Sequence, residues 1–189
     1  MNRFPLAVLI LLNAPIGFSQ EDQNIQMTFE TAGGRNVLTH TVTVEGELKD
    51  VWALFTTTGG CLSWMTPFAN IDFREGGIGE TSYDPNAKPG DAGNIVSRYL
   101  KIEPMAYYES KLERIPKDNP YGEVLMDLTS RVAFEALPGK VKVSIAMIGW
   151  NDSEAHNNVR KFFESGNTWY CQRLIRRCKE GPLPWKGVQ

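Results

Sequence analysis

The sequence lacks an excess of charge of either sign. Its 189 residues hold 20 Lys and Arg against 22 Asp and Glu, a formal net charge of −2 at pH 7. Proteins that bind nucleic acid gather their basic residues into a stripe or a run, whereas the charges here are interspersed. The sequence therefore predicts no nucleic-acid partner.

Histidine and the usual metal and catalytic motifs are equally scarce. The chain has two histidines, His40 and His156, and no CxxC, HExxH or GxSxG pattern. Those spacings bring zinc ligands or a nucleophile within reach of their partners, so their absence argues against a metal site and a hydrolase triad. No cofactor is expected either, because the Gly-rich stretch 76–79 is too short for a phosphate-binding loop.

Long apolar runs are also missing, except for a short one at the amino terminus. Residues 1–19 combine an early charge at Arg3, an apolar run from Phe4 to Leu12 and small residues before Gln20. These are the parts of a secretory signal, and the run is shorter than the roughly 20 residues that span a bilayer. The sequence predicts an exported protein, periplasmic or secreted, without stable membrane insertion.

Only three cysteines occur: Cys61, Cys171 and Cys178. An exported protein can keep a disulfide. Seven residues of helix span roughly 10 Å, which is beyond disulfide reach, so a bridge within the chain would join Cys61 to Cys171 or to Cys178. Three buried thiols are an equal alternative, because a free cysteine packs like a small apolar residue.

The chain divides into a polar lead-in, one domain and a short tail. Residues 20–35 are polar and Gly-rich and are predicted to be flexible. Residues 36–181 form the predicted domain, and residues 182–189 form a tail that begins PLPW. About 170 residues follow the signal, enough for a single domain with a sizeable core.

The domain is predicted to open with a strand and two short helices. Residues 36–46 alternate as a half-buried strand does. Its apolar face holds Leu38, His40, Val42 and Val44. Residues 47–57 follow at helical spacing, and residues 61–68 can form a second short helix.

Strands and turns are predicted over residues 69–148, followed by one long helix over 151–181. Hairpin turns are expected at Gly76-Gly77, at 103–105 and at Pro138-Gly139, with longer loops at 84–93 and 116–123. The broad apolar face of the helix comprises Val159, Phe162, Phe163, Gly166, Trp169, Tyr170 and Leu174. The predicted fold is α+β. A curved antiparallel sheet of about six to seven strands has two short helices after its first strand and one long C-terminal helix across it.

Four stretches of the sequence match, in order, the pattern of a known superfamily. They contain Val51, Trp52 and Trp64 in the first helices, Arg74 before Gly76 and Gly77, Gly93 and Pro104 around a strand, and Gly149, Gly166, Trp169 and Leu174 at the end. The pattern resembles the START/polyketide-cyclase (SRPBCC) helix-grip superfamily, in particular the branch named for activators of the heat-shock ATPase chaperone.

This resemblance implies the helix-grip fold over roughly residues 36–181, a shape that usually encloses an apolar pocket. It is less specific for function, because one fold hosts many activities. Relatives in this branch are mostly cytoplasmic, so the predicted export signal argues against a cytosolic chaperone partner.

Strand alternation supplies candidates for a pocket beneath the helix. The predicted ligand contacts are Arg98, Tyr108, Phe134, Met147, Phe163 and Tyr170. His40 and Tyr108 are weak candidates for acid–base catalysis, although a histidine on an apolar face is more often a hydrogen-bonded core residue. His156 is expected to face solvent. The alternative is a packed core in which Arg98 lies at a strand edge or pairs with Glu80 or Glu109.

Three functional hypotheses follow. The leading one is an exported carrier or sensor that holds a small hydrophobic molecule between sheet and helix, without catalysis. The second is a cyclase- or hydrolase-type enzyme that acts on a small aromatic or lipid-like substrate in the same cavity, with His40 or Tyr108 as acid or base. The third is a protein-binding module, which predicts an exposed apolar patch at the PLPW tail.

Overall fold

The computed structural model describes residues 25–183 and 185, and the predicted signal at 1–19 lies outside them. The strands are β1 Ile25–Ala32, β2 Arg35–Glu45, β3 Phe68–Ile71, β4 Ile78–Ser82, β5 Ile95–Glu103, β6 Tyr107–Arg114, β7 Thr129–Leu137 and β8 Lys140–Trp150. The helices are α1 Leu48–Thr56, α2 Thr58–Leu62, α3 Gly122–Asp127 and α4 Glu154–Glu180.

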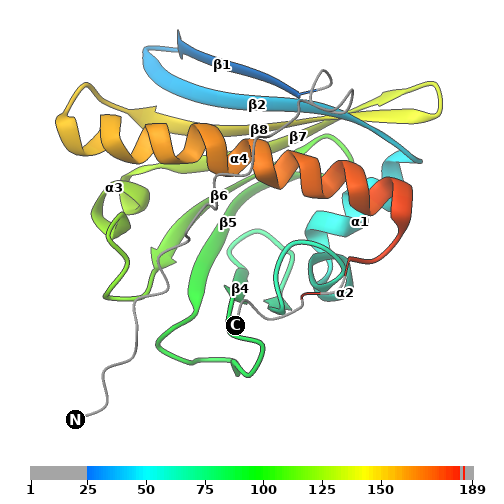
Figure 1. The fold of residues 1–189 in the computed structure, drawn as a ribbon, viewed down its shortest axis with the longest axis horizontal. Coiled ribbons are helices and arrows are strands. Elements are labelled where there is room, and N and C mark those ends of the chain that lie inside the picture. The colour runs from blue at the N-terminus through cyan, green and yellow to red at the C-terminus, as the bar shows by residue number, and fades with distance from the viewer. Residues whose placement is uncertain (1–24, 184, 186–189) are drawn as a thin grey trace, which may run out of the picture.

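The eight strands form one antiparallel sheet, in the order β1-β2-β8-β7-β6-β5-β4-β3. Figure 1 shows the sheet curving behind α4, with α3 near the start of that helix and α1 and α2 near its end. The predicted α+β fold, with two short helices after β2 and a long C-terminal helix, is confirmed. The hairpin turns at Gly76-Gly77, at 103–105 and at Pro138-Gly139 are confirmed as well.

The segment 25–35 is not the flexible lead-in that its composition predicts. It forms β1, which pairs with β2 from Ile25↔Val42 to Ala32↔Arg35. Gly33 and Gly34 make the turn at φ +58° and +75°, a left-handed conformation that glycine adopts without strain. β1 is an edge strand in which only Ile25 is partly buried, so its sequence shows no alternation of buried and exposed positions.

The predicted loop at 116–123 is also partly wrong, because its last residues begin α3. This helix buries Val124 and Leu125 where it packs against β6 and α4. Six residues are too few to display a helical period in the sequence.

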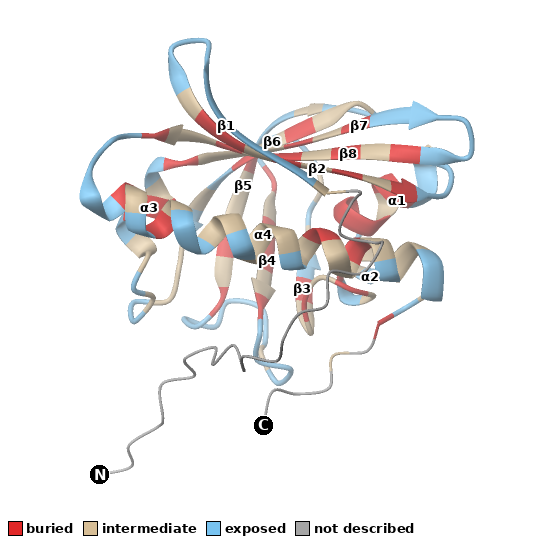
Figure 2. Cartoon of the chain, turned by 45° about the horizontal axis from the view of Figure 1, so that its top comes forward, coloured by how far each residue is buried: buried red, intermediate tan, exposed pale blue. Residues whose placement is uncertain are grey.

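Two groups of buried side chains make up the core. The first cluster lies beneath the C-terminal half of α4 and includes α1 residues Trp52 and Phe55 together with Trp64, Val143 and Leu174. The second cluster lies at the other end of α4. It comprises Leu38, Val124, Leu125, Leu128, Met147, Trp150 and Val159. Figure 2 shows the buried positions on the strands and α1, with exposed positions at the hairpin ends.

α4 packs chiefly against β2 and, less extensively, against β1. Ser153 caps its start, since its hydroxyl accepts from the His156 N–H at 3.3 Å. The buried stripe is narrower than predicted: Phe162 is 38% exposed and Trp169 is 45% exposed. The helix contacts the sheet along one side only, so these two rings lie outside the core.

His156 is buried, contrary to the prediction that it faces solvent. Its Nδ1 accepts from the Asn151 N–H at 3.3 Å, and its ring lies 6.0 Å from the Trp150 ring. The first turn of α4 folds back over the end of β8, and Asp127 Oδ2 of α3 lies 3.8 Å from Nε2. This enclosure depends on tertiary packing that no local pattern reveals.

Candidate functional site

Aromatic rings from α1, β5, β6 and β7 meet on the inner face of the sheet. This aromatic cluster comprises Trp52, Phe55, Phe73, Tyr99, Tyr108 and Phe134. Its rings pack edge to face, with centroid distances from 4.8 Å for Phe73 and Tyr99 to 6.2 Å for Trp52 and Tyr108. Such geometry adds to the stabilisation that burial of the rings provides.

The contribution of β5 to this cluster is Tyr99, not the predicted Arg98. β5 pairs with β6 through two register shifts, at Val96/Ser97 and at Tyr99/Lys101. The first shift leaves Glu113 of β6 unpaired in the register and the second leaves Leu100 of β5 unpaired, so strict alternation is broken along these two strands. The prediction assumed unbroken alternation and therefore placed Arg98 inside.

Arg98 lies on the outer face, where it forms an ion pair with Glu113. Its Nη2 donates to Glu113 Oε2 at 2.7 Å, and its Nη1 donates to the Gly76 carbonyl. The ion pair raises the pKa of Arg98 and lowers that of Glu113. The interpretation of Arg98 as a paired residue at the sheet surface is supported, although its partner is neither Glu80 nor Glu109.

The other predicted ligand contacts divide between the two core clusters. Tyr108 and Phe134 belong to the aromatic cluster, and Tyr170 of α4 lies against Trp64 with a centroid distance of 4.5 Å. Met147 and Phe163 belong to the second cluster or pack on it. The structure therefore brings three of the six predicted residues together.

Three tyrosines near the first cluster carry hydroxyls in apolar surroundings. We call Tyr99, Tyr108 and Tyr170 the tyrosine cluster. Burial raises the pKa of each, and the neighbouring charges of Tyr99 on Tyr108, and of Tyr108 on Tyr170, raise two of them further. The Tyr99 and Tyr108 rings lie 5.8 Å apart, and Tyr170 packs against the same core cluster.

None of the three hydroxyls is hydrogen-bonded to a residue that the structure describes. Buried polar groups in folded proteins almost always have a partner, which can be a protein group, a water molecule or a ligand. The tyrosine cluster thus offers donors and acceptors on an apolar background, which is the composition of a small-molecule site.

The Tyr99 hydroxyl occupies space that is open because residue 79 is a glycine. A Cβ placed on Gly79 would lie 2.7 Å from the Tyr99 hydroxyl oxygen. That distance is shorter than Cβ contacts in real structures, so any other residue at this position would displace the hydroxyl. Gly79 of β4 thereby fixes the depth at which the Tyr99 ring sits.

His40 is fully buried and takes a structural position. Its Nε2 lies 3.0 Å from the Glu164 carbonyl oxygen of α4, so Nε2 is the donor and Nδ1 carries no proton in the neutral ring. Burial lowers the pKa of His40, which keeps the ring neutral. This link between β2 and α4 supports the interpretation as a hydrogen-bonded core residue over acid–base catalysis.

The three cysteines are free in the structure, so the predicted bridge from Cys61 to Cys171 or Cys178 is not formed. Cys61 Sγ instead donates to the Phe55 carbonyl of α1 at 3.5 Å. Burial raises the pKa of Cys61 and of Cys171 to about 12. The alternative of buried thiols is the one that the structure supports.

A separate groove of about 480 Å³ lies between the segment 115–124 and the start of α4. Its lining includes Ile115, Tyr121 and Val124 on one side and Ala155, Asn158 and Val159 on the other. Val124 and Val159 also belong to the second core cluster, so packed side chains form the floor. No predicted ligand contact lines this groove, because the prediction treated residues 116–123 as an unstructured loop.

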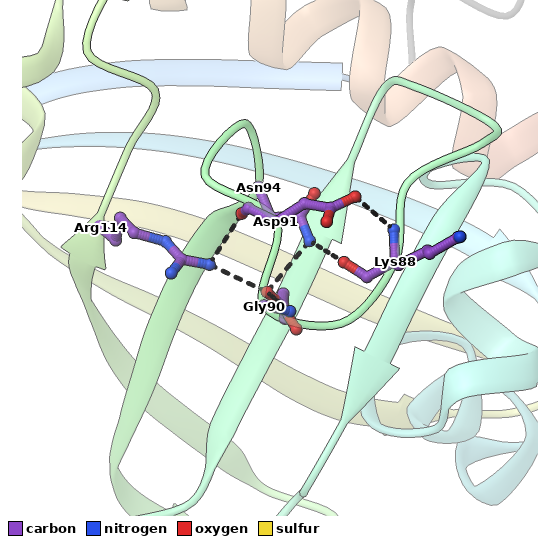
Figure 3. Close-up of polar contacts among 6 residues, drawn as sticks. Lys88, Gly90, Asp91, Asn94 and Arg114 are labelled. Atoms are coloured by element: carbon purple, nitrogen blue, oxygen red, sulfur yellow. Dashed lines mark hydrogen bonds and ion pairs between the residues drawn. The ribbon is translucent and has the colours of Figure 1, made fainter.

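A polar network fixes the loop that joins β4 and β5. Buried Glu80 accepts at Oε1 from the Gly90 N–H, from Asn94 Nδ2 and from Arg114 Nη2, at 2.8, 3.0 and 2.9 Å. Figure 3 shows Arg114 of β6 reaching the loop, where it also donates to the Asp91 carbonyl. The network holds the segment that begins with Tyr83.

The described residues give no indication of a metal site or a membrane span. No three His, Cys, Asp or Glu side chains among them gather closely enough to hold a metal ion. None of the described helices combines the length and apolar character needed to cross a bilayer.

Comparison with protein families identifies the chain. Residues 45–176 match the family described as "Activator of Hsp90 ATPase homolog 1-like protein". The chain belongs to this family. The match extends from the end of β2 through most of α4, so this activator-like family accounts for every element except β1 and most of β2. A search of curated proteins found no match.

Solved structures share the helix-grip fold of this activator-like family. The Aha1 dimer from Colwellia psychrerythraea is 12% identical, with a TM-score of 0.55 over 77% of this chain and 97% of that one. Protein MLL2253 from Mesorhizobium loti is 12% identical, with a TM-score of 0.59 over 77% and 99%. CalU16 from Micromonospora echinospora is 15% identical, with a TM-score of 0.54 over 85% and 86%. At these identities the likeness shows the fold alone.

Proposed function

We propose that the protein binds a small, largely apolar molecule between the inner face of the sheet and α4, beside the tyrosine cluster. One observation carries the proposal: three tyrosines gather at one apolar cluster, and their hydroxyls form no hydrogen bond with a described residue. A ligand with one polar group would satisfy them, and apolar rings around them would bury the rest of it.

The arrangement favours binding over catalysis. Burial raises the pKa of Tyr108 well above its ordinary value, so the phenol stays protonated and cannot act as a base near neutral pH. His40 is engaged with the α4 backbone. Tyr108 is therefore not a base at neutral pH, and His40 is enclosed in the core at 0% exposure.

The protein-binding alternative has less support. Its predicted exposed patch at the PLPW tail includes Leu183, which is only 7% exposed. The Leu183 N–H donates to the Ser63 carbonyl at 2.7 Å. This part of the tail is thus bound to the protein itself.

Binding of phenylnaphthylamine, a neutral fluorescent probe, tests the proposal. Ser110 lies opposite Tyr99 on the inner face and is 9% exposed, whereas the next residue, Lys111, points outward. Ser110→Leu should fill the space and abolish probe binding while the protein stays folded. Lys111→Leu is the matched control and should bind as the wild type does.

Two outcomes would count against this location. If the space is a packed core, Ser110→Leu should instead lower the free energy of unfolding by about 1–3 kcal/mol through overpacking. If the probe sits in the groove beside α3, Ala155→Trp and not Ser110→Leu would remove its binding. Native mass spectrometry of the purified protein then shows whether a molecule of cellular origin is retained.

We also propose export, on the pattern of residues 1–19 alone. Expression from the natural start, followed by mass spectrometry of the protein outside the cytoplasm, should find Gln20 as the first residue. A full-length chain confined to the cytoplasm would contradict the proposal and reopen the question of a cytosolic partner.

A further inference from the structure

Arg173 stands out among the cations of α4 because its guanidinium lies beside two indole rings that pack on each other. The guanidinium carbon is 4.3 Å from the Trp185 ring centre and 5.3 Å from that of Trp169. Nε donates to the Trp64 carbonyl at 2.9 Å. Nη2 is buried and has no hydrogen-bond partner among the residues that the structure describes.

No carboxylate of the described residues forms an ion pair with this arginine. Other arginines of α4 do have such partners: Arg160 pairs with Glu164 and Arg176 pairs with Glu180. A charged group that is partly withdrawn from water is normally paired, because unpaired burial is costly. The position next to Arg173 is thus suited to a negative group that the described residues do not provide.

Two further donors lie beside the guanidinium. The indole Nε1 of Trp185 is buried and unpartnered as well. The Tyr83 ring lies 5.7 Å from the Trp185 ring. We call Tyr83, Trp169, Arg173 and Trp185 the arginine–aromatic cluster. It presents one positive charge and two N–H donors beside rings that a ligand can reach from solvent, since Tyr83 is 63% and Trp169 is 45% exposed.

Trp64 connects this cluster to the tyrosine cluster. Its carbonyl accepts from Arg173 Nε, and its ring centre lies 4.5 Å from that of Tyr170. A bound molecule could therefore contact both clusters, with an apolar body beside Tyr170 and an anionic end at Arg173.

We infer that the ligand is an amphipathic organic anion, whose carboxylate-like group binds Arg173 and the Trp185 N–H while its apolar part lies beside the tyrosine cluster. This inference rests on the proposed function and adds the chemical class of the ligand. A guanidinium binds planar oxyanions through parallel N–H donors, which matches the free Nη2.

A matched pair of probes separates the inference from the proposed function. Anilinonaphthalene sulfonate is phenylnaphthylamine with an added sulfonate, so the two share one apolar body. The wild-type protein should bind the sulfonate more tightly. Arg173→Gln should weaken the sulfonate at least about tenfold, since a charge-assisted hydrogen bond is lost, and leave the neutral probe unchanged. Arg176→Gln, on the same helix, is the control and should alter neither affinity.

Trp185→Phe provides a second variant in case loss of the Arg173 bond to Trp64 disturbs the fold. It keeps an aromatic ring beside the guanidinium and removes only the N–H, so it should weaken the sulfonate alone. Neutral-probe binding with no Arg173-dependent preference for the sulfonate would overturn the inference and leave the proposed function standing. Absence of binding by either probe would overturn both.

Discussion

The thiols of Cys61 and of Cys171 on α4 are buried, and that of Cys178 on the same helix is partly buried. Burial raises the pKa of Cys61 and Cys171 to about 12 and that of Cys178 to about 11. Because the thiolate is the reactive form, the native protein should react slowly with iodoacetamide at neutral pH, with Cys178 first.

Thiol titration of the denatured, unreduced protein checks the pairing. It should give three free thiols, in agreement with the structure. One free thiol would show that a bridge from Cys61 forms after export, which is the other of the two alternatives that the sequence leaves open.

His40 gives the stability of the protein a pH dependence of predictable sign. Its folded pKa lies below the ordinary 6.5, so below that pH the unfolded chain takes up a proton that the native state excludes. Stability from this residue is complete above pH 6.5 and is lost as the pH falls.

His40→Gln tests this assignment, since a glutamine amide can donate to the Glu164 carbonyl but does not titrate. Urea unfolding at about pH 7.5 and about pH 5.5 should show a smaller difference in the variant than in the wild type. Equal differences in the two proteins would assign the acid sensitivity to other groups.

For single residues, the sequence predicted the buried side chains correctly on strands where buried and exposed positions alternate regularly. Tyr108, Phe134 and Met147 are buried on the predicted face. It failed for Arg98, because a β-bulge leaves no sign in the sequence. It also missed Arg173 and Tyr83, whose proximity depends on how α4 lies relative to the loop after β4.

At the scale of elements, α2 depends on a close approach to α1. A Cβ on Gly60 would lie 1.9 Å from the Ala53 carbonyl oxygen, whereas a Cβ on Gly59 would meet nothing within 4 Å. Gly60→Ala should lower the free energy of unfolding by about 1–3 kcal/mol or more, since backbone must move.

The adjacent glycine is the control for that prediction. Gly59→Ala should be neutral or stabilise by up to about 1 kcal/mol, because alanine is the better helix former. Thermal denaturation of both variants measures the contrast. Similar melting temperatures would mean that the two helices separate more easily than the structure indicates.

Most elements could be predicted from the sequence, and the two that could not share a physical reason. β1 is an exposed edge strand and α3 is a short helix, so neither has the repeated burial that produces a pattern. The Gly-Gly pair at 33–34 was interpreted as flexibility, although it forms a tight turn.

At the scale of the whole molecule, the C-terminal segment fastens α4 to α2. The Leu183 N–H bonds to the Ser63 carbonyl, and Arg177 Nε bonds to the Ser63 hydroxyl at 2.8 Å. Leu183→Ala should lower the free energy of unfolding by about 2 kcal/mol or more through the cavity it leaves.

Leu137→Ala, at the exposed end of β7, is the matched control. Leu137 is 38% exposed, so its truncation should change stability by less than about 0.5 kcal/mol. Chemical denaturation compares the two. An equally small effect at both positions would indicate that the tail adds little to the fold.

The pairing of β2 with β8 also has a consequence for how the chain folds. These strands join residues that are distant in the sequence, for example Thr41 and Ser144, which are 103 positions apart. Closing so long a loop costs entropy before any contact repays it, and folds rich in such pairings form in milliseconds to seconds. During synthesis, β2 emerges long before its partner, while the hairpins from β3 to β6 can pair locally. We therefore expect the pairing of β2 with β8 to form late, and α4 to pack on β2 only when the chain is nearly complete.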